Sequence, residues 1–154
     1  IVEMTKRIIT EEQVIQHIRT HMDIWCKSYG SHVLEKHVNI PEKTMLSRIG
    51  TTENNHFIKS VSSFYDETDG QQIMDLLQRA LESEAQYIAK WCNYSKRAWL
   101  GLNFYGLPDG ITAKACRYDV LNQVFPVNRF VIFLSKREQY PFYLENAYPV
   151  FDQD

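Results

Sequence analysis

The sequence predicts a single α+β domain in which helices come first and an antiparallel sheet follows. Apolar residues recur at helical spacing in the first part of the chain, whereas beyond residue 99 they recur at every second position. Helices followed by strands are typical of an α+β domain and not of a doubly wound α/β fold. With 44% hydrophobic residues among 154, the chain can bury one compact core.

Two helices are predicted in the first third of the chain. A capping box begins the first one, residues 11–28, and Gly30 ends it. A second, shorter helix lies between Pro41 and Gly50, which are residues typical of a helix start and of the position after a helix end.

A long third helix and three strands complete the prediction. The helix follows Thr68-Asp69 and continues to about residue 93 along one apolar face. The first strand begins at about residue 99 and closes at a Gly-rich and Pro-containing turn. Residues 127–134 and 141–148 are predicted to form two more strands, joined in hairpin fashion by a polar loop.

The chain contains no predicted membrane span, because no apolar stretch approaches the ~20 residues that a bilayer requires. The first residues show neither a signal peptide nor an initiator Met, so we expect a fragment of a longer protein. Residues 1–154 are expected to form one domain. Residues 1–28 either belong to it or are the remnant of an entry region that packs on it.

Cysteine content and charge narrow the function further. Cys26, Cys92 and Cys116 are far apart and form no zinc-ligand pattern, so we expect free thiols, as in a cytoplasm. The net charge of -2 is unusual for a protein that binds nucleic acid. Any nucleic-acid site must therefore be a local basic patch.

Five separated segments together carry a resemblance to a known family. The segments are Gly30-Ser-His-Val-Leu-Glu-Lys-His37-Val38, Met45-Leu-Ser-Arg48-Ile49, Val61-Ser-Ser-Phe64-Tyr-Asp66, the strand after Trp99, and Glu145-Asn-Ala-Tyr148-Pro149. They resemble the bacterial RNase A-like toxin family, which is found at the C-terminus of contact-dependent growth inhibition proteins, and the resemblance spans roughly residues 28–151. It implies a fold like that of pancreatic ribonuclease without its disulfides.

The resemblance also implies a catalytic set, which falls on His37, Arg48, Asn146 and Tyr148. One position departs from the family pattern, because Asn146 stands where the family usually has Thr. Metal-free cleavage of RNA needs a proton carrier, for which His37 is suited, and donors for the charged phosphorane, for which the planar fork of Arg48 is suited. Both residues also have a purely structural interpretation. Arg48 would then be a solvated surface charge, and Tyr148 would be a core residue packed beside Pro149.

Asn146 and Tyr148 lie two positions apart on the last predicted strand, so their side chains are expected on one face, about 6.6 Å apart along it. Tyr148 is suited to donate a hydrogen bond to the phosphorane or to orient His37, and Asn146 to bind phosphate or a base edge.

Four further residues are secondary candidates for binding RNA. His32 is five positions from His37, which places it on the opposite face of a strand or roughly 140° away on a helix, so fixing a local turn is its expected role. Lys36 and Lys43 are expected to contact phosphates or simply to face solvent. Ser63 is expected at a turn, where its hydroxyl either contacts phosphate or serves the turn beside a core Phe64.

The sequence gives only weak evidence for a metal site. His17 and His21 have the i, i+4 spacing of helical metal ligands, but no Glu completes a His-Glu-x-x-His pattern, and a solvated helix face is the favoured interpretation.

The predicted function is that of a metal-independent endoribonuclease toxin, which needs no cofactor and inhibits the growth of neighbouring bacteria. Cleavage by attack of the 2′-hydroxyl would leave a 2′,3′-cyclic phosphate. One alternative is a catalytically impaired module of the same fold that binds RNA or protein. Another is a metal-dependent DNase toxin.

Partners and location follow from this prediction. The substrate is RNA, and a cognate immunity protein is expected to cover the cleft at His37 and Tyr148. The domain is otherwise expected to be monomeric. It would be secreted or delivered from the cell surface as part of a larger protein and would act in the cytoplasm of the target cell.

Overall fold

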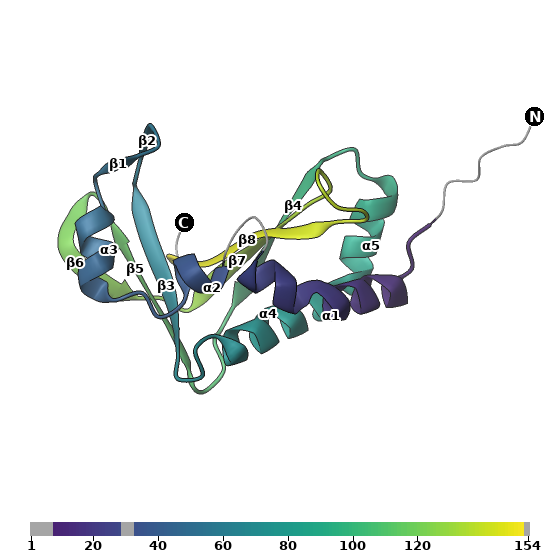
Figure 1. Cartoon of the computed structure of the whole chain (residues 1–154), viewed down its shortest axis with the longest axis horizontal. Coiled ribbons are helices and arrows are strands. Elements are labelled where there is room, and N and C mark those ends of the chain that lie inside the picture. Colours follow the sequence, from purple (N-terminus) through teal and green to yellow (C-terminus); the bar gives the residue numbers. More distant parts are fainter. Residues whose placement is uncertain (1–7, 29–32, 153–154) are drawn as a thin grey trace, which may run out of the picture.

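Five helices and two three-stranded antiparallel sheets make up the fold in the computed structural model, which describes residues 8–28 and 33–152 (Figure 1). A short β-hairpin stands apart from the two sheets. The helices are α1 (Glu11–Lys27), α2 (Val33–His37), α3 (Glu42–Arg48), α4 (Gln71–Ser83) and α5 (Ala85–Tyr94). The strands are β1 (Thr52–Glu53), β2 (His56–Phe57), β3 (Ser60–Asp66), β4 (Trp99–Tyr105), β5 (Ile111–Arg117), β6 (Val120–Pro126), β7 (Arg129–Ser135) and β8 (Tyr143–Val150).

The first predicted helix is confirmed as α1, and its capping box is present. The Thr10 hydroxyl accepts the backbone N–H of Gln13, and the Gln13 side chain accepts the backbone N–H of Thr10. These bonds satisfy donors that a helix start otherwise leaves open. The apolar face of α1 is buried against α4 and α5, with Ile18 and Trp25 fully buried.

The prediction of one long third helix is wrong, because the helix is broken at Glu84. This residue has φ -106° and ψ 17°, and its backbone N–H bonds to the carbonyl of Leu81. The segment contains no Gly or Pro to signal a break. Both halves keep a buried face, which includes Leu77 in α4 and Ile88 in α5, so the apolar pattern continues through the break.

The three predicted strands are confirmed and form the sheet β4-β7-β8. None of the three strands of the second sheet, β3-β5-β6, was predicted from the sequence. Ser63 lies inside strand β3 opposite Lys114, so its predicted place at a turn is wrong, whereas Phe64 is a core residue as predicted.

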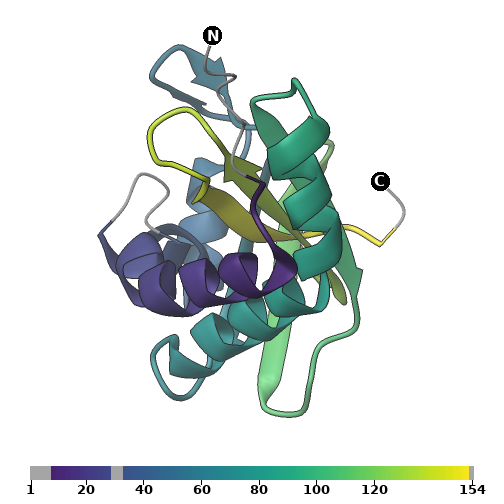
Figure 2. The same cartoon turned by 90° about the vertical axis from the view of Figure 1, so that its right-hand side faces the viewer.

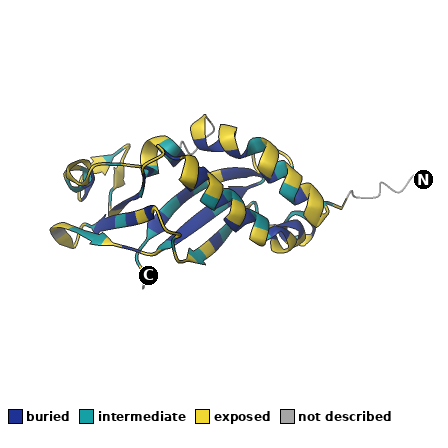
Figure 3. Ribbon diagram, turned by 90° about the horizontal axis from the view of Figure 1, so that it is seen from below, coloured by how far each residue is buried: buried dark blue, intermediate teal, exposed yellow. Residues whose placement is uncertain are grey.

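The two sheets meet where β8 packs against β3 and β5. Figure 2 shows α1 lying beside α4, with α5 next to them, in front of the strands. The outer faces of these helices are exposed, and the strands beneath them are mostly buried (Figure 3). A smaller apolar cluster lies under α3 and contains Met45, Ile49, Val61 and Cys116. This second cluster holds α3 beside β3.

Cys26, Cys92 and Cys116 are free thiols, as predicted, and the first and last of them are buried. Among residues 8–28 and 33–152, no helix has the length and apolar character that crossing a membrane requires.

Candidate active site

His37 is the last residue of α2, and α2 packs against β8. The chain directly after His37 is bonded to β3. Asn39, whose φ of 56° reverses the chain, donates its backbone N–H to the Phe64 carbonyl at 2.7 Å. Its side chain bonds to both backbone groups of Asp66 at 2.8 Å. Together these bonds fix His37 at the junction of the two sheets.

Ser63 and Tyr65 strengthen the same junction. The Ser63 hydroxyl accepts the backbone N–H of Ile40 at 3.0 Å and donates to the Phe64 carbonyl. The Tyr65 hydroxyl donates to the Ile40 carbonyl at 2.6 Å. Ser63 is fully buried, so in this structure its hydroxyl holds the chain beside His37 and does not face solvent.

The His37 ring is half-buried, and its environment favours the neutral form. Nδ1 lies 3.3 Å from the Ser62 carbonyl, which can only accept a hydrogen bond, so Nδ1 carries the proton and Nε2 keeps a free lone pair. Burial, together with the positive charges of Lys36 and Arg48, lowers the pKa of His37 to about 4 although the bond to Ser62 opposes the shift. Near pH 7 the imidazole is therefore a neutral proton acceptor.

Tyr148 lies against His37, and the two ring centroids are 5.4 Å apart. On its other side the Tyr148 ring stacks on Phe133 of β7, with centroids 6.0 Å apart. Burial raises the pKa of Tyr148, so its phenol keeps its proton at neutral pH. The site thus pairs a neutral base with a neutral O–H donor.

Asn146 and Tyr148 project from one face of β8, as predicted, because Ala147 between them is fully buried on the opposite face. A β-bulge interrupts the register next to Asn146, since Phe133 pairs with Asn146 whereas Leu134 pairs with Leu144. The Asn146 Oδ1 accepts the Ala147 backbone N–H at 2.9 Å. The amide nitrogen, which takes no part in this bond, is the group available to a ligand.

Arg48 ends α3, and its fork is occupied. Nε and Nη2 donate to the two carboxylate oxygens of Glu53 at 2.8 and 3.0 Å. Nη1 takes no part in this pair. Glu53 was not singled out from the sequence; it lies five residues after Arg48 on β1, and the turn that follows the helix at Ile49 and Gly50 brings the two together.

The structure gives less information on the remaining candidates for binding RNA. Lys36 and Lys43 are exposed, and the positive charge of Lys36 acts on His37. His32 lies outside the described residues, as does Gly30.

The prediction of a solvated face for His17 and His21 is wrong. His17 Nε2 bonds to the Phe142 carbonyl at 2.7 Å, and both imidazoles are half-buried and pack against Trp25. These contacts anchor α1 to the start of the segment that enters β8. Within residues 8–28 and 33–152, no group of three or more His, Cys, Asp or Glu side chains is arranged to hold a metal ion.

Comparison with known proteins places the sequence in a family. The sequence profile of the bacterial CdiA-CT RNase A domain matches residues 31–149. The chain belongs to this family. The CdiA-CT family match therefore contains all four residues of the implied catalytic set and leaves α1 outside it.

The fold is shared with a solved structure. A chain of the crystal structure of a CdiA-CT/CdiI complex from Y. kristensenii 33638 superposes with a TM-score of 0.63 at 20% sequence identity. The match covers 78% of this chain and 99% of that chain. No curated protein matches the sequence. The expected α+β, RNase A-like fold without disulfides is confirmed, as is the family that the sequence motifs indicated.

Proposed function

We propose that the protein is a metal-independent endoribonuclease toxin that cuts RNA through its own 2′-hydroxyl. The observation that carries this proposal is the contact between a neutral His37 and Tyr148, within range of the positive charge of Arg48, in a chain of the CdiA-CT RNase A family. Membership of this family supports a toxin of the ribonuclease type, and the geometry of the site supports the specific reaction.

His37 is the base in this mechanism. Its Nε2 takes the proton from the 2′-hydroxyl, and the resulting oxygen attacks the adjacent phosphorus. Because the Ser62 carbonyl accepts from Nδ1, the imidazolium that forms is stabilised in its orientation. General base catalysis of this kind contributes roughly 10²–10⁴-fold to a rate.

Tyr148, Arg48 and Asn146 serve the phosphate. The bond from phosphorus to the 5′-oxygen breaks as the 2′,3′-cyclic phosphate forms, and the protonated phenol of Tyr148 supplies a proton to the leaving oxygen. The guanidinium of Arg48 stabilises the negative charge on the non-bridging oxygens. The free amide nitrogen of Asn146 donates to the phosphate or to a base edge, in the place where the family has a hydroxyl.

The test is an incubation with total bacterial RNA in EDTA, with detection of 2′,3′-cyclic phosphate ends. We expect the wild-type protein to cut, and His37→Ala to cut at least tenfold more slowly, consistent with the loss of a general base. Tyr148→Phe removes only the hydroxyl and should also slow cleavage. His56→Ala, which removes an exposed histidine on β2, is the matched control and should cut like the wild type.

Each contrary result has a definite meaning. Undiminished cleavage by His37→Ala would reject this site. Cleavage that EDTA abolishes would favour a metal-dependent nuclease. Intact RNA in every sample would favour a binding module of the same fold.

We also infer that a cognate immunity protein covers the proposed site at His37 and Tyr148, and that the domain is otherwise monomeric. The solved structure of similar fold is that of a CdiA-CT/CdiI complex. A ribonuclease of this kind would be delivered as part of a larger protein and act in the cytoplasm of the target cell, where its RNA substrate lies.

A further inference from the structure

We infer that the hollow beside β4 is a binding site for single-stranded RNA that flanks the cleaved phosphate. In this site Phe133 and Trp99 stack with bases, and Lys90 and Arg97 hold the backbone. The inference rests on the proposed ribonuclease function, because it extends the substrate of the His37 site along the protein surface.

A row of aromatic rings leads from the proposed base to this hollow. From the His37 ring, Tyr148 follows at 5.4 Å, Phe133 at a further 6.0 Å, and Trp99 at a further 6.4 Å between ring centroids. The three last rings come from β8, β7 and β4, which are neighbours in one sheet. A strand of RNA that leaves the catalytic residues in this direction would meet one ring face after another.

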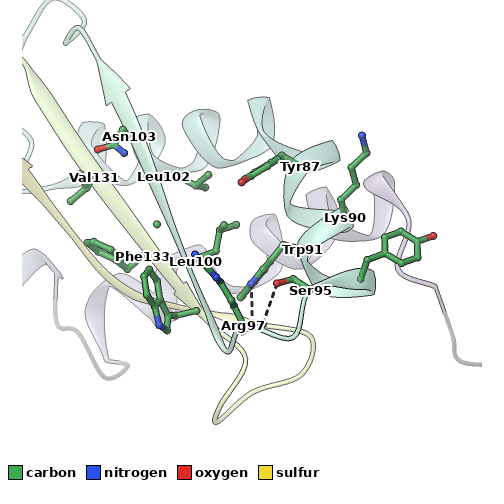
Figure 4. Close-up of a pocket in the computed structure, with 13 residues that line it drawn as sticks. Tyr87, Lys90, Trp91, Ser95, Arg97, Leu100, Leu102, Asn103, Val131 and Phe133 are labelled. Atoms are coloured by element: carbon green, nitrogen blue, oxygen red, sulfur yellow. Dashed lines mark hydrogen bonds between the residues drawn. The ribbon is translucent and has the colours of Figure 1, made fainter.

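The hollow has the size of a ligand site, at about 670 Å³. It reaches around β4, which is the edge strand of its sheet. Figure 4 shows Val131 and Phe133 on one side of the β4 ribbon and Tyr87 and Lys90 on the other. The hollow thus has lining residues on both sides of β4, and one of them, Phe133, also stacks on Tyr148 of the proposed active site.

Gly101 leaves room for the Phe133 ring beside β4. It pairs with Phe133 across the two strands, and a Cβ at position 101 would lie 2.9 Å from the Phe133 ring. A side chain at Gly101 would therefore push the ring away from β4. With glycine there, the ring of Phe133 lies directly against the strand and bridges Tyr148 and Trp99.

The charge of the hollow is complementary to a phosphate backbone. Lys90 and Arg97 line it and are exposed, and no Asp or Glu is among its lining residues. In the part of the chain that the structure describes, neither cation is paired with a carboxylate. This is a local basic patch of the kind that a chain with net charge -2 needs in order to bind RNA.

Exposed aromatic rings combined with free cations favour single-stranded nucleic acid over a protein partner. Trp99 is 47% exposed and Tyr94 is 73% exposed. Stacking on such rings needs unpaired bases, because bases within a duplex are already stacked. A short loop or an unpaired end of an RNA is thus the form of substrate that fits.

The experiment measures the binding of a fluorescein-labelled, single-stranded 2′-O-methyl oligonucleotide by anisotropy. This probe lacks the attacking hydroxyl, so binding is measured without cleavage. We expect Trp99→Ala to weaken binding about tenfold and Trp99→Phe to retain most of it, as base stacking predicts. Tyr118→Ala is the matched control, since Tyr118 is 46% exposed and lies outside the hollow.

A second readout tests the cations. Lys90→Ala and Arg97→Ala should each reduce the slope of log affinity against log salt by about 0.7, the value for one phosphate contact to a single strand. Arg79→Ala, an exposed arginine on α4 outside the hollow, should leave the slope unchanged.

The outcomes separate this inference from the proposed function. If the wild type cuts RNA and the Trp99, Lys90 and Arg97 variants bind the probe like the wild type, the hollow is rejected as an RNA site and the proposed ribonuclease function is retained. If the variants lose binding but no sample cuts RNA, the hollow is retained as an RNA site and the ribonuclease function is rejected. The inference would also be overturned if the hollow bound the immunity protein but the wild-type protein did not bind the oligonucleotide.

Discussion

His37 titrates far from the usual range of a histidine. Because burial lowers its pKa from 6.5 to about 4, the neutral form that acts as a base persists as the pH falls below 6. We therefore predict that kcat/KM for a short RNA stays level from pH 7 to about 5 and declines only as the pH approaches 4. The measurement is a pH–rate profile of the free enzyme.

A substitution that removes a neighbouring positive charge gives a second test of this prediction. The positive charge of Lys36 opposes a second positive charge on His37, so Lys36→Met should move the acidic limb of the profile to higher pH. A wild-type midpoint near 6.5 would show that His37 is solvated in the active enzyme.

The Arg48 fork is held by Glu53, which competes with any phosphate for the same donors. Both side chains are more than one-third exposed, so water screens this ion pair and its contribution is small. Glu53→Gln should therefore lower KM by up to about fivefold, with kcat little changed. Steady-state kinetics with a short RNA decide this, and a loss of kcat would show instead that Glu53 positions Arg48.

At the scale of helices and strands, local chemistry was predictable from the sequence and long-range pairing was not. The capping box of α1 lies within four residues and was found. Strand β5 was not predicted because two of its four buried positions, Ala113 and Ala115, carry small side chains, which give a weak alternating signal. Strand β6 contains Asn122 at φ 63° and ends at Pro126, both of which are more typical of turns.

The candidate site was also predictable only in its local part. The shared face of Asn146 and Tyr148 follows from the alternation of side chains along one strand. The contact of Tyr148 with His37 depends on the packing of α2 on β8, which no local pattern reports, and only the family resemblance brought the two together. Phe133 and Trp99 were missed because their importance arises from cross-strand neighbours.

We propose that α1 is part of the folded domain, although the family match begins after it. Trp25 is fully buried and its indole N–H donates to the Gln139 side chain at 3.0 Å. Trp25→Ala should lower the free energy of unfolding by about 3–5 kcal/mol, as for other buried aromatic residues. Urea unfolding followed by circular dichroism measures this change.

Ile24→Ala is the matched control for that experiment, because Ile24 is adjacent and 53% exposed. The control should be close to the wild type. If Trp25→Ala costs no more than Ile24→Ala, α1 is an independent segment that rests on the domain and does not complete its core.

Across the whole molecule, the proposed substrate path follows the ring contacts from His37 to Trp99 and then the hollow that Lys90 lines. An immunity protein that covers the proposed site at His37 and Tyr148 should therefore block cleavage, and a partner that extends over Trp99 should also block binding of the single-stranded probe. The measurement is RNA cleavage at increasing amounts of the purified immunity protein, with an expected endpoint at a 1:1 ratio. A stable complex that still cuts RNA would contradict the proposed interface.

The distance in sequence between His37 and Tyr148, more than a hundred residues, has a consequence for the cell that makes the protein. While the chain leaves the ribosome, its proposed base emerges long before β8 is made, and β8 must then dock against α2, β3 and β7. Contacts between such distant segments form slowly. Under the proposed function, the newly made toxin is harmless during this interval, which gives the producing cell time to supply the immunity protein.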